Sequence, residues 1–341
     1  MGIVDWFKKR PGKFDPNRVS DEMVDWAVEK AVALTNPKLK LLPTCRKSLA
    51  PAVETTINFL RARVSALPAV HVLSSRSWPV DPVLRAFFVA PADIEGVLGA
   101  SDNLRTLFDK NPELDEAYAV LGMAFKLQQV FGMALQGEVV RRDVAQTSAS
   151  FSDHRARLCD GDELRLRRVI GVALYEYLLA QALSEIGQER VERQDLQTSR
   201  SLTRTRLRLL QQHGPGLGSV FGEAPAAQSE QARLTAELLE NERQLEALGG
   251  DSVLEAELDC LVDVLNNPQR YLHFESRCLR LNRMNLVLDE SSSEAAADVD
   301  FSVVELSGHM TTSRAFVLAR VPRAELPPAK KMNVDDASRY L

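Results

Sequence analysis

The residues best suited to chemistry are Ser152, Asp153 and His154, which follow one another in the segment FSDHR. A serine, a carboxylate and an imidazole form the hydrolase triad, but there the side chains converge from different parts of the fold. Adjacent residues cannot converge in that way, which excludes a triad made by these three alone. Asp153 and His154 remain an alternative as the acid–base site of an enzyme, which requires a concave pocket and shifted pKa values. The competing interpretation is a loop cap or a pair that faces a partner.

A second chemical candidate is the glycine-rich run GPGLGSVFG, which covers Gly214–Gly222. Phosphate-binding loops follow a β-strand and carry a GK[ST] ending or the GxGxxG spacing, and this run has neither. Its glycines are explained by a chain reversal between two helices. If this turn has a function, the apolar residues Leu217, Val220 and Phe221 are the predicted contacts with a partner.

Histidine and cysteine lack the spacings that bind metals. The five histidines show no i,i+4 pairing with each other or with a cysteine, and the four cysteines form no CxxC motif. We therefore predict no metal site and no cofactor, and we interpret the cysteines as reduced thiols of a cytosolic protein. No secretory signal and no transmembrane helix are predicted, because no apolar run is long enough.

Arginines in the segment 200–208 offer an alternative function in nucleic-acid binding. Arg200, Arg204, Arg206 and Arg208 could neutralise phosphates, and such binding would fall steeply with salt. The chain has a formal net charge of −5, however, and no aromatic residues alternate with these arginines to stack on bases. Nucleic acid is therefore a less favoured partner than protein.

The N-terminal segment 1–19 begins with an apolar and aromatic stretch, which a basic stretch follows. Trp6 and Phe7 could enter the boundary of an anionic membrane while Lys8 and Lys9 face its headgroups. This would give weak peripheral attachment at the inner face of the membrane. The alternative is that this short turn docks its aromatic residues on the protein itself.

Two charged segments on either side of the glycine-rich run predict a helical hairpin. Segments 189–212 and 226–248 have similar lengths, and they carry an excess of arginine and of glutamate, respectively. Opposite charge favours pairing of the two arms, and the leucines of the second arm, with Asn241 among them, are typical of a coiled-coil seam. We therefore predict an antiparallel coiled coil that projects from the body.

The rest of the chain predicts a helical body and a small β element. Periodicity and capping signals predict helices over 21–34, 45–67, 111–135 and 164–186, the last two deeply buried. Alternating patterns predict strands within 271–289 and 301–321, and 144–152 is open between strand and loop. The predicted fold class is mainly α, with the projecting antiparallel hairpin and a small C-terminal antiparallel β element (α+β). The predicted units are an amphipathic segment at 1–19, the helical body at 20–187, the hairpin at 188–250, a returning helix with the β element at 251–321 and a flexible tail at 322–341.

These features favour a non-enzymatic cytosolic protein that acts as a scaffold or regulator through protein–protein interaction. The charged hairpin is typical of a partner-binding arm, and the candidate chemical groups do not form a reactive constellation. The predicted partner is another protein or a second copy of this chain, with an anionic membrane surface as an additional contact. The nucleic-acid and acid–base interpretations remain as alternative functions.

Overall fold

The computed structural model describes residues 19–136, 139–213, 224–247, 252–289, 292, 294–307 and 312–328. Contacts between Cα atoms divide the chain into two compact units. The first unit combines Met1–Asn58 with Tyr177–Asn267, and the second combines Phe59–Glu176 with Pro268–Leu341. Each unit is therefore assembled from segments that lie far apart in the sequence.

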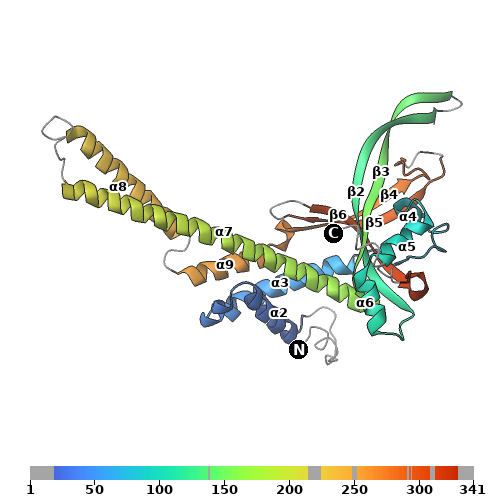
Figure 1. Cartoon of the computed structure of the whole chain (residues 1–341), viewed down its shortest axis with the longest axis horizontal. Helices are drawn as coiled ribbons and strands as arrows, with labels where there is room; N and C mark the ends of the chain where they lie inside the picture. The colour runs from blue at the N-terminus through green and yellow to red at the C-terminus, as the bar shows by residue number, and fades with distance from the viewer. Residues whose placement is uncertain are drawn as a thin grey trace, which may run out of the picture. The chain divides into compact units, whose positions relative to one another are not determined.

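The first unit is helical throughout its described part. Its helices are α2 (Asp21–Leu34), the short 3-10 helix η1 (Pro37–Leu41), the first part of α3 (Cys45–Ser65), most of α7 (Glu163–His213), α8 (Ala224–Ala247) and α9 (Val253–Asn266) (Figure 1). Ser20 caps α2 by accepting a hydrogen bond from the Met23 amide at 3.3 Å. The buried residues of α2 recur at helical spacing, which gives this helix one apolar stripe.

A buried carboxylate joins three elements of the first unit. Glu257 of α9 is 4% exposed, and its Oε1 accepts a hydrogen bond from Arg190 of α7 at 2.6 Å. Its other oxygen accepts from the side-chain amide of Asn36, which caps η1. A buried charge is stable only when it is paired and hydrogen-bonded, and these two donors meet that requirement.

The helices α7 and α8 pair through polar side chains as well as leucines. Asn241 donates to Ser199 at 3.0 Å, Thr203 donates to Glu237 at 3.1 Å, and Arg204 donates to Glu242 at 2.7 Å. Leu234 and Leu245 of α8 are buried. The antiparallel pairing expected from the opposite charges of the arms is therefore present in the described part of the hairpin.

The second unit is built on a six-stranded sheet. Its strands are β1 (His71–Val72), β2 (Glu116–Gln136), β3 (Val139–Asp160), β4 (Leu272–Leu281), β5 (Ala297–Leu306) and β6 (Thr312–Pro322). The five long strands are antiparallel in the order β3-β2-β6-β5-β4, and β1 adds a short parallel pairing with β6. The helices α4 (Pro82–Phe87), α5 (Pro91–Gly99) and α6 (Asp102–Lys110) belong to the same unit, as do the short 3-10 helices η3 (Pro268–Arg270) and η4 (Arg323–Glu325).

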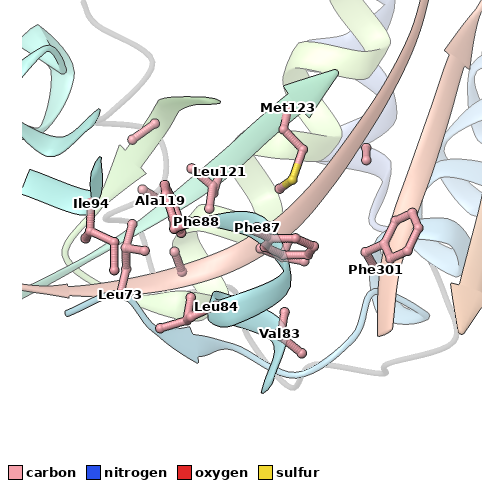
Figure 2. Close-up of a cluster of buried hydrophobic side chains, with 14 of the residues drawn as sticks. Leu73, Val83, Leu84, Phe87, Phe88, Ile94, Ala119, Leu121, Met123 and Phe301 are labelled. Carbon is pink, nitrogen blue, oxygen red and sulfur yellow. The ribbon is translucent and has the colours of Figure 1, made fainter. Parts of the chain in front are cut away.

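The main core of this unit lies between the sheet and the three short helices. In Figure 2, side chains of α4 gather against residues that point inward from β2 and β5. The labelled members of this core are Leu73, Val83, Leu84, Phe87, Phe88, Ile94, Ala119, Leu121, Met123 and Phe301. Alternate residues of β2 are fully buried here, as expected for a strand with one face on a core.

The loop after β4 connects the two edges of the sheet. The Val287 amide donates to the Thr147 carbonyl at 2.8 Å, and the Ala149 amide donates to the Asn285 carbonyl at 2.8 Å. Because β3 and β4 are the opposite edge strands, these bonds show that the sheet curls upon itself. The loop satisfies part of the β3 edge, which would otherwise present unpaired backbone groups.

The predicted fold class is wrong in its balance of helix and strand. The described residues are 56% helical and 26% strand, and the sheet organises a whole unit instead of forming a small C-terminal element. The main error is the predicted buried helix at 111–135, most of which is β2. This segment is apolar on both faces near its start, so the period of two is hidden, a known ambiguity of buried strands. The supposed helix start at Asn111 instead ends α6.

Candidate interaction site

The outer parts of β2 and β3 form a two-stranded ribbon. β6 pairs with β2 only from Glu116 to Met123, whereas β3 pairs with β2 as far as Gln136. In Figure 1 these two strands extend well beyond the other strands of their sheet. Beyond Met123, β2 has no strand partner other than β3 in the part of the chain that the structure describes. Within this outer part, the loop after β4 bonds to β3 at Thr147 and Ala149.

One face of this ribbon is apolar, and we call it the ribbon face. Side chains alternate along β2, so Phe125, Leu127, Gln129 and Phe131 share this face. The residues opposite them on β3 are Phe151, Ala149, Thr147 and Ala145, respectively. The ribbon face therefore presents a continuous row of aromatic and aliphatic side chains with one polar pair in its middle.

The inner end of the ribbon face belongs to the core. The ring of Phe125 lies 5.3 Å from that of Phe151 and 5.0 Å from that of Phe301, measured between centroids. The Arg277 guanidinium lies 5.6 Å above Phe125. Toward the tip, Leu127 is 46% exposed and Phe131 is 77% exposed. The same apolar row that fills the core thus continues into solvent.

The opposite face of the ribbon is mainly polar. It carries Lys126 and Gln128 on β2, across from Ser150 and Ser148 on β3. Lys126 and Gln128 are exposed. The contrast between the faces shows that the apolar row is a property of one side and not of the ribbon as a whole. Exposed apolar side chains gathered on one surface are typical of interaction sites, whereas single ones are ordinary.

The structure separates the two members of the predicted acid–base pair. Asp153 lies at a bulge of β3 with φ of 50°, and its carboxylate accepts hydrogen bonds from Arg314 at 2.6 Å and Arg155 at 3.0 Å. These two bonds, that from Arg314 foremost, hold the pKa of Asp153 below its ordinary value. A carboxylate committed to two arginines is not available to orient His154.

His154 lies at the edge of a cavity of about 330 Å³ that also contains Ser101 and Arg157. Its ring stacks on Phe88 with 4.6 Å between centroids, and its Nε2 is buried without a hydrogen-bond partner among the described residues. Burial lowers the pKa of His154, although the charge of Asp93 and a hydrogen bond to the Phe87 backbone act in the opposite direction. The pocket required by the enzyme hypothesis is present, but the pair that was to act in it is not formed.

The arginines proposed for nucleic acid are partly engaged by the second arm of the hairpin. Arg204 and Arg200 lie 2.7 Å and 3.5 Å from Oε1 of Glu242. Arg206 and Arg208 are exposed, and neither makes an ion pair with another residue in the described ranges. The acidic arm therefore neutralises half of this group, which disfavours a continuous phosphate-binding surface.

Two sets of predicted contacts lie outside the described residues. They are the hairpin tip with Leu217, Val220 and Phe221, and the N-terminal Trp6, Phe7, Lys8 and Lys9. Both remain sequence-based predictions.

No group of three or more histidine, cysteine, aspartate or glutamate side chains that could hold a metal ion occurs among the described residues. In the same residues one helix, α7, is long and apolar enough to cross a membrane by length and composition, a test that core helices of soluble proteins also pass.

Burial raises the pKa of the Cys159 thiol to about 12, which keeps it protonated and unreactive.

Comparison of the chain with protein-family models, curated proteins and solved structures gives no match. Leu127 and Phe131 escape prediction from the sequence, because the apolar pattern of 111–135 predicts a helix. The signal that could have found them is the alternation of apolar residues at odd positions from Phe125 onward, interrupted only at Gln129.

Proposed function

We propose that this protein is a non-enzymatic interaction protein that binds another protein through the ribbon face. The single observation that carries the proposal is the exposure of Leu127 and Phe131 on the same face as the buried end of the row. A buried aromatic side chain removes about 150–250 Å² from water, which makes such residues frequent anchors of protein interfaces. Covering Phe131 would therefore contribute strongly to binding.

The polar pair in the ribbon face favours a protein over a lipid partner. Gln129 donates a hydrogen bond to the Thr147 hydroxyl at 3.2 Å, in the middle of the apolar row. Acyl chains offer no hydrogen-bonding groups for the remaining donors and acceptors of this pair, whereas a protein surface does.

The test is a comparison of two double variants in affinity purification from the native cells under non-denaturing conditions. Leu127→Ser with Phe131→Ser removes the apolar anchors, and Lys126→Ser with Gln128→Ser changes the opposite face as the matched control. We expect the first variant to lose a stoichiometric protein partner that the wild type and the control retain. Equal recovery of all partners by both variants would contradict the proposal.

Two further outcomes would change the identity of the partner. Light scattering of the purified chain at several concentrations detects a homo-oligomer. If the Leu127 and Phe131 substitutions dissociate such an oligomer, the partner is a second copy of the chain and not another protein. Flotation with anionic vesicles detects lipid binding. If these substitutions abolish vesicle binding, the partner is a membrane and not a protein.

A further inference from the structure

A cleft of about 760 Å³ in the second unit lies between the region of α4 and the two ends of the β4–β5 connection. This volume falls within the range of small-molecule sites, which is roughly 300–1,000 Å³. Its floor includes the buried side chains of Phe88, Leu281 and Val299. Val89 and Met284 stand at its rim and are exposed. The cleft is thus apolar from its floor to part of its rim.

The neutral polar groups that line this cleft are already satisfied by the protein. The Trp78 indole donates to the Phe88 carbonyl at 2.9 Å, and the Asn285 side chain donates to the Ala86 carbonyl at 2.7 Å. Asn282 donates to Glu294 at 2.7 Å, while its side-chain oxygen accepts from the amides of Met284 and Leu286. These groups therefore offer a ligand little hydrogen bonding.

The charged groups of the cleft are of one sign. Among the described residues that line it, Arg85 and Arg283 are the only charged ones, and both are exposed. Neither forms an ion pair or a side-chain hydrogen bond within the described residues. Two guanidinium groups without an anion above an apolar floor favour a ligand that combines an anionic head with an apolar body.

We propose that this cleft binds a small amphipathic carboxylate, with its apolar chain on the floor and its carboxylate at Arg85 and Arg283. An extended peptide fits less well, because its backbone would bury donors and acceptors for which the lining offers no partners. An apolar chain has no such requirement. A carboxylate also matches the paired donors of a guanidinium group.

The experiment uses octanoate as the probe and octanol as its uncharged analogue, both titrated into the full chain. Methyl-labelled methionine reports binding by NMR, because Met284 is one of the seven methionines and lines the cleft. We expect octanoate to shift the Met284 signal, and Arg85→Gln with Arg283→Gln to weaken octanoate binding at least about tenfold. Octanol should shift the same signal equally in the wild type and in this double variant.

Arg76→Gln is the matched control, because Arg76 is an exposed arginine of the same unit outside the cleft lining. It should leave octanoate binding unchanged. Absence of any Met284 shift with octanoate would overturn the proposal, as would octanoate binding that the double substitution does not weaken. Binding of an acidic peptide at Met284 in place of octanoate would also overturn it. The purified double variant must give the wild-type spectrum for the other methionines, which establishes that its fold is intact.

Discussion

Leu127 and Phe131 lie on the same face of β2, in line with Phe125, whose ring packs against Phe301 in the core. One strand thus carries a core residue and solvent-exposed apolar residues in a single row. The core packs against Phe125, whereas Phe131 is mostly exposed. Phe125 should therefore contribute to stability, whereas Leu127 and Phe131 should contribute to binding.

We expect Phe125 and Phe131 to differ sharply in their effect on stability. Phe125→Ala removes the contacts with Phe151 and Phe301 and should lower the free energy of unfolding by about 2–4 kcal/mol. Phe131→Ala should change it by less than about 0.5 kcal/mol, because the side chain is mostly exposed. Urea denaturation followed by circular dichroism measures both values, and equal losses would show that Phe131 is also a core residue.

The buried carboxylate of Glu257 should make the stability of the fold decrease at acidic pH. Burial alone would raise the pKa of Glu257, but hydrogen bonds from Arg190 and Asn36 hold it below its ordinary value. The unfolded chain then takes up the proton first as pH falls, so the stabilisation present near neutral pH is lost below about pH 4.5. Glu257→Gln should lower the free energy of unfolding at neutral pH by about 1–3 kcal/mol and flatten this acid slope.

Asp259→Asn on the exposed face of α9 is the control for this measurement. Urea titrations at a series of pH values should give this variant the wild-type slope. A Glu257→Gln protein with the wild-type slope would show that another carboxylate is responsible.

His154 should make the stability of the fold depend on pH in a less acidic range than Glu257 does. Its pKa is lowered mainly by burial, so the unfolded state binds a proton before the folded state does. Stability contributed by the neutral ring is therefore lost as pH falls through the ordinary histidine range near 6.5. Urea midpoints between neutral pH and about pH 5 should decline less in His154→Gln than in the wild type. His273→Gln, at an exposed position of β4, should retain the wild-type decline; identical curves for all three proteins would refute this role of His154.

The charge pairing of the hairpin can be tested by reversal. Glu242→Arg places a cation beside Arg204 and Arg200 and should loosen the pairing of α7 and α8. Adding Arg204→Glu should restore part of the loss, with a coupling energy of about 0.2–1 kcal/mol because these side chains are half-exposed. Hydrogen exchange of the backbone amides near Ser199 and Asn241 reports the local opening. Exchange that none of the substitutions changes would mean that apolar contacts alone hold the arms together.

The helices of the first unit were predictable because their signals are local. Ser20 caps α2 where the sequence suggests, and the opposite charges of the two arms anticipate their pairing. The long β2–β3 ribbon was not predictable in the same way. Apolar residues on both faces of the early part of β2 imitate a buried helix, and its strand character depends on pairing with the distant β6.

The bulges of β3 explain the misplacement of the acid–base pair. An extra residue near Asp153 shifts the register against β2, and the residue adopts φ of 50°. The bulge directs Asp153 to Arg314 of β6 while His154 packs against Phe88. Neighbours in the sequence are thereby separated by their surroundings, which sequence spacing alone cannot reveal.

Site-specific photo-crosslinking along β2 tests the central claim most directly. A benzophenone amino acid is placed at Phe131 on the ribbon face, and in a second protein at Gln128 on the opposite face, before irradiation in the native cells. We expect a defined protein adduct from position 131 and none from position 128, identified by mass spectrometry of the purified product. Adducts of equal yield from both positions, or adducts only to lipid or to a second copy of the chain, would contradict this claim.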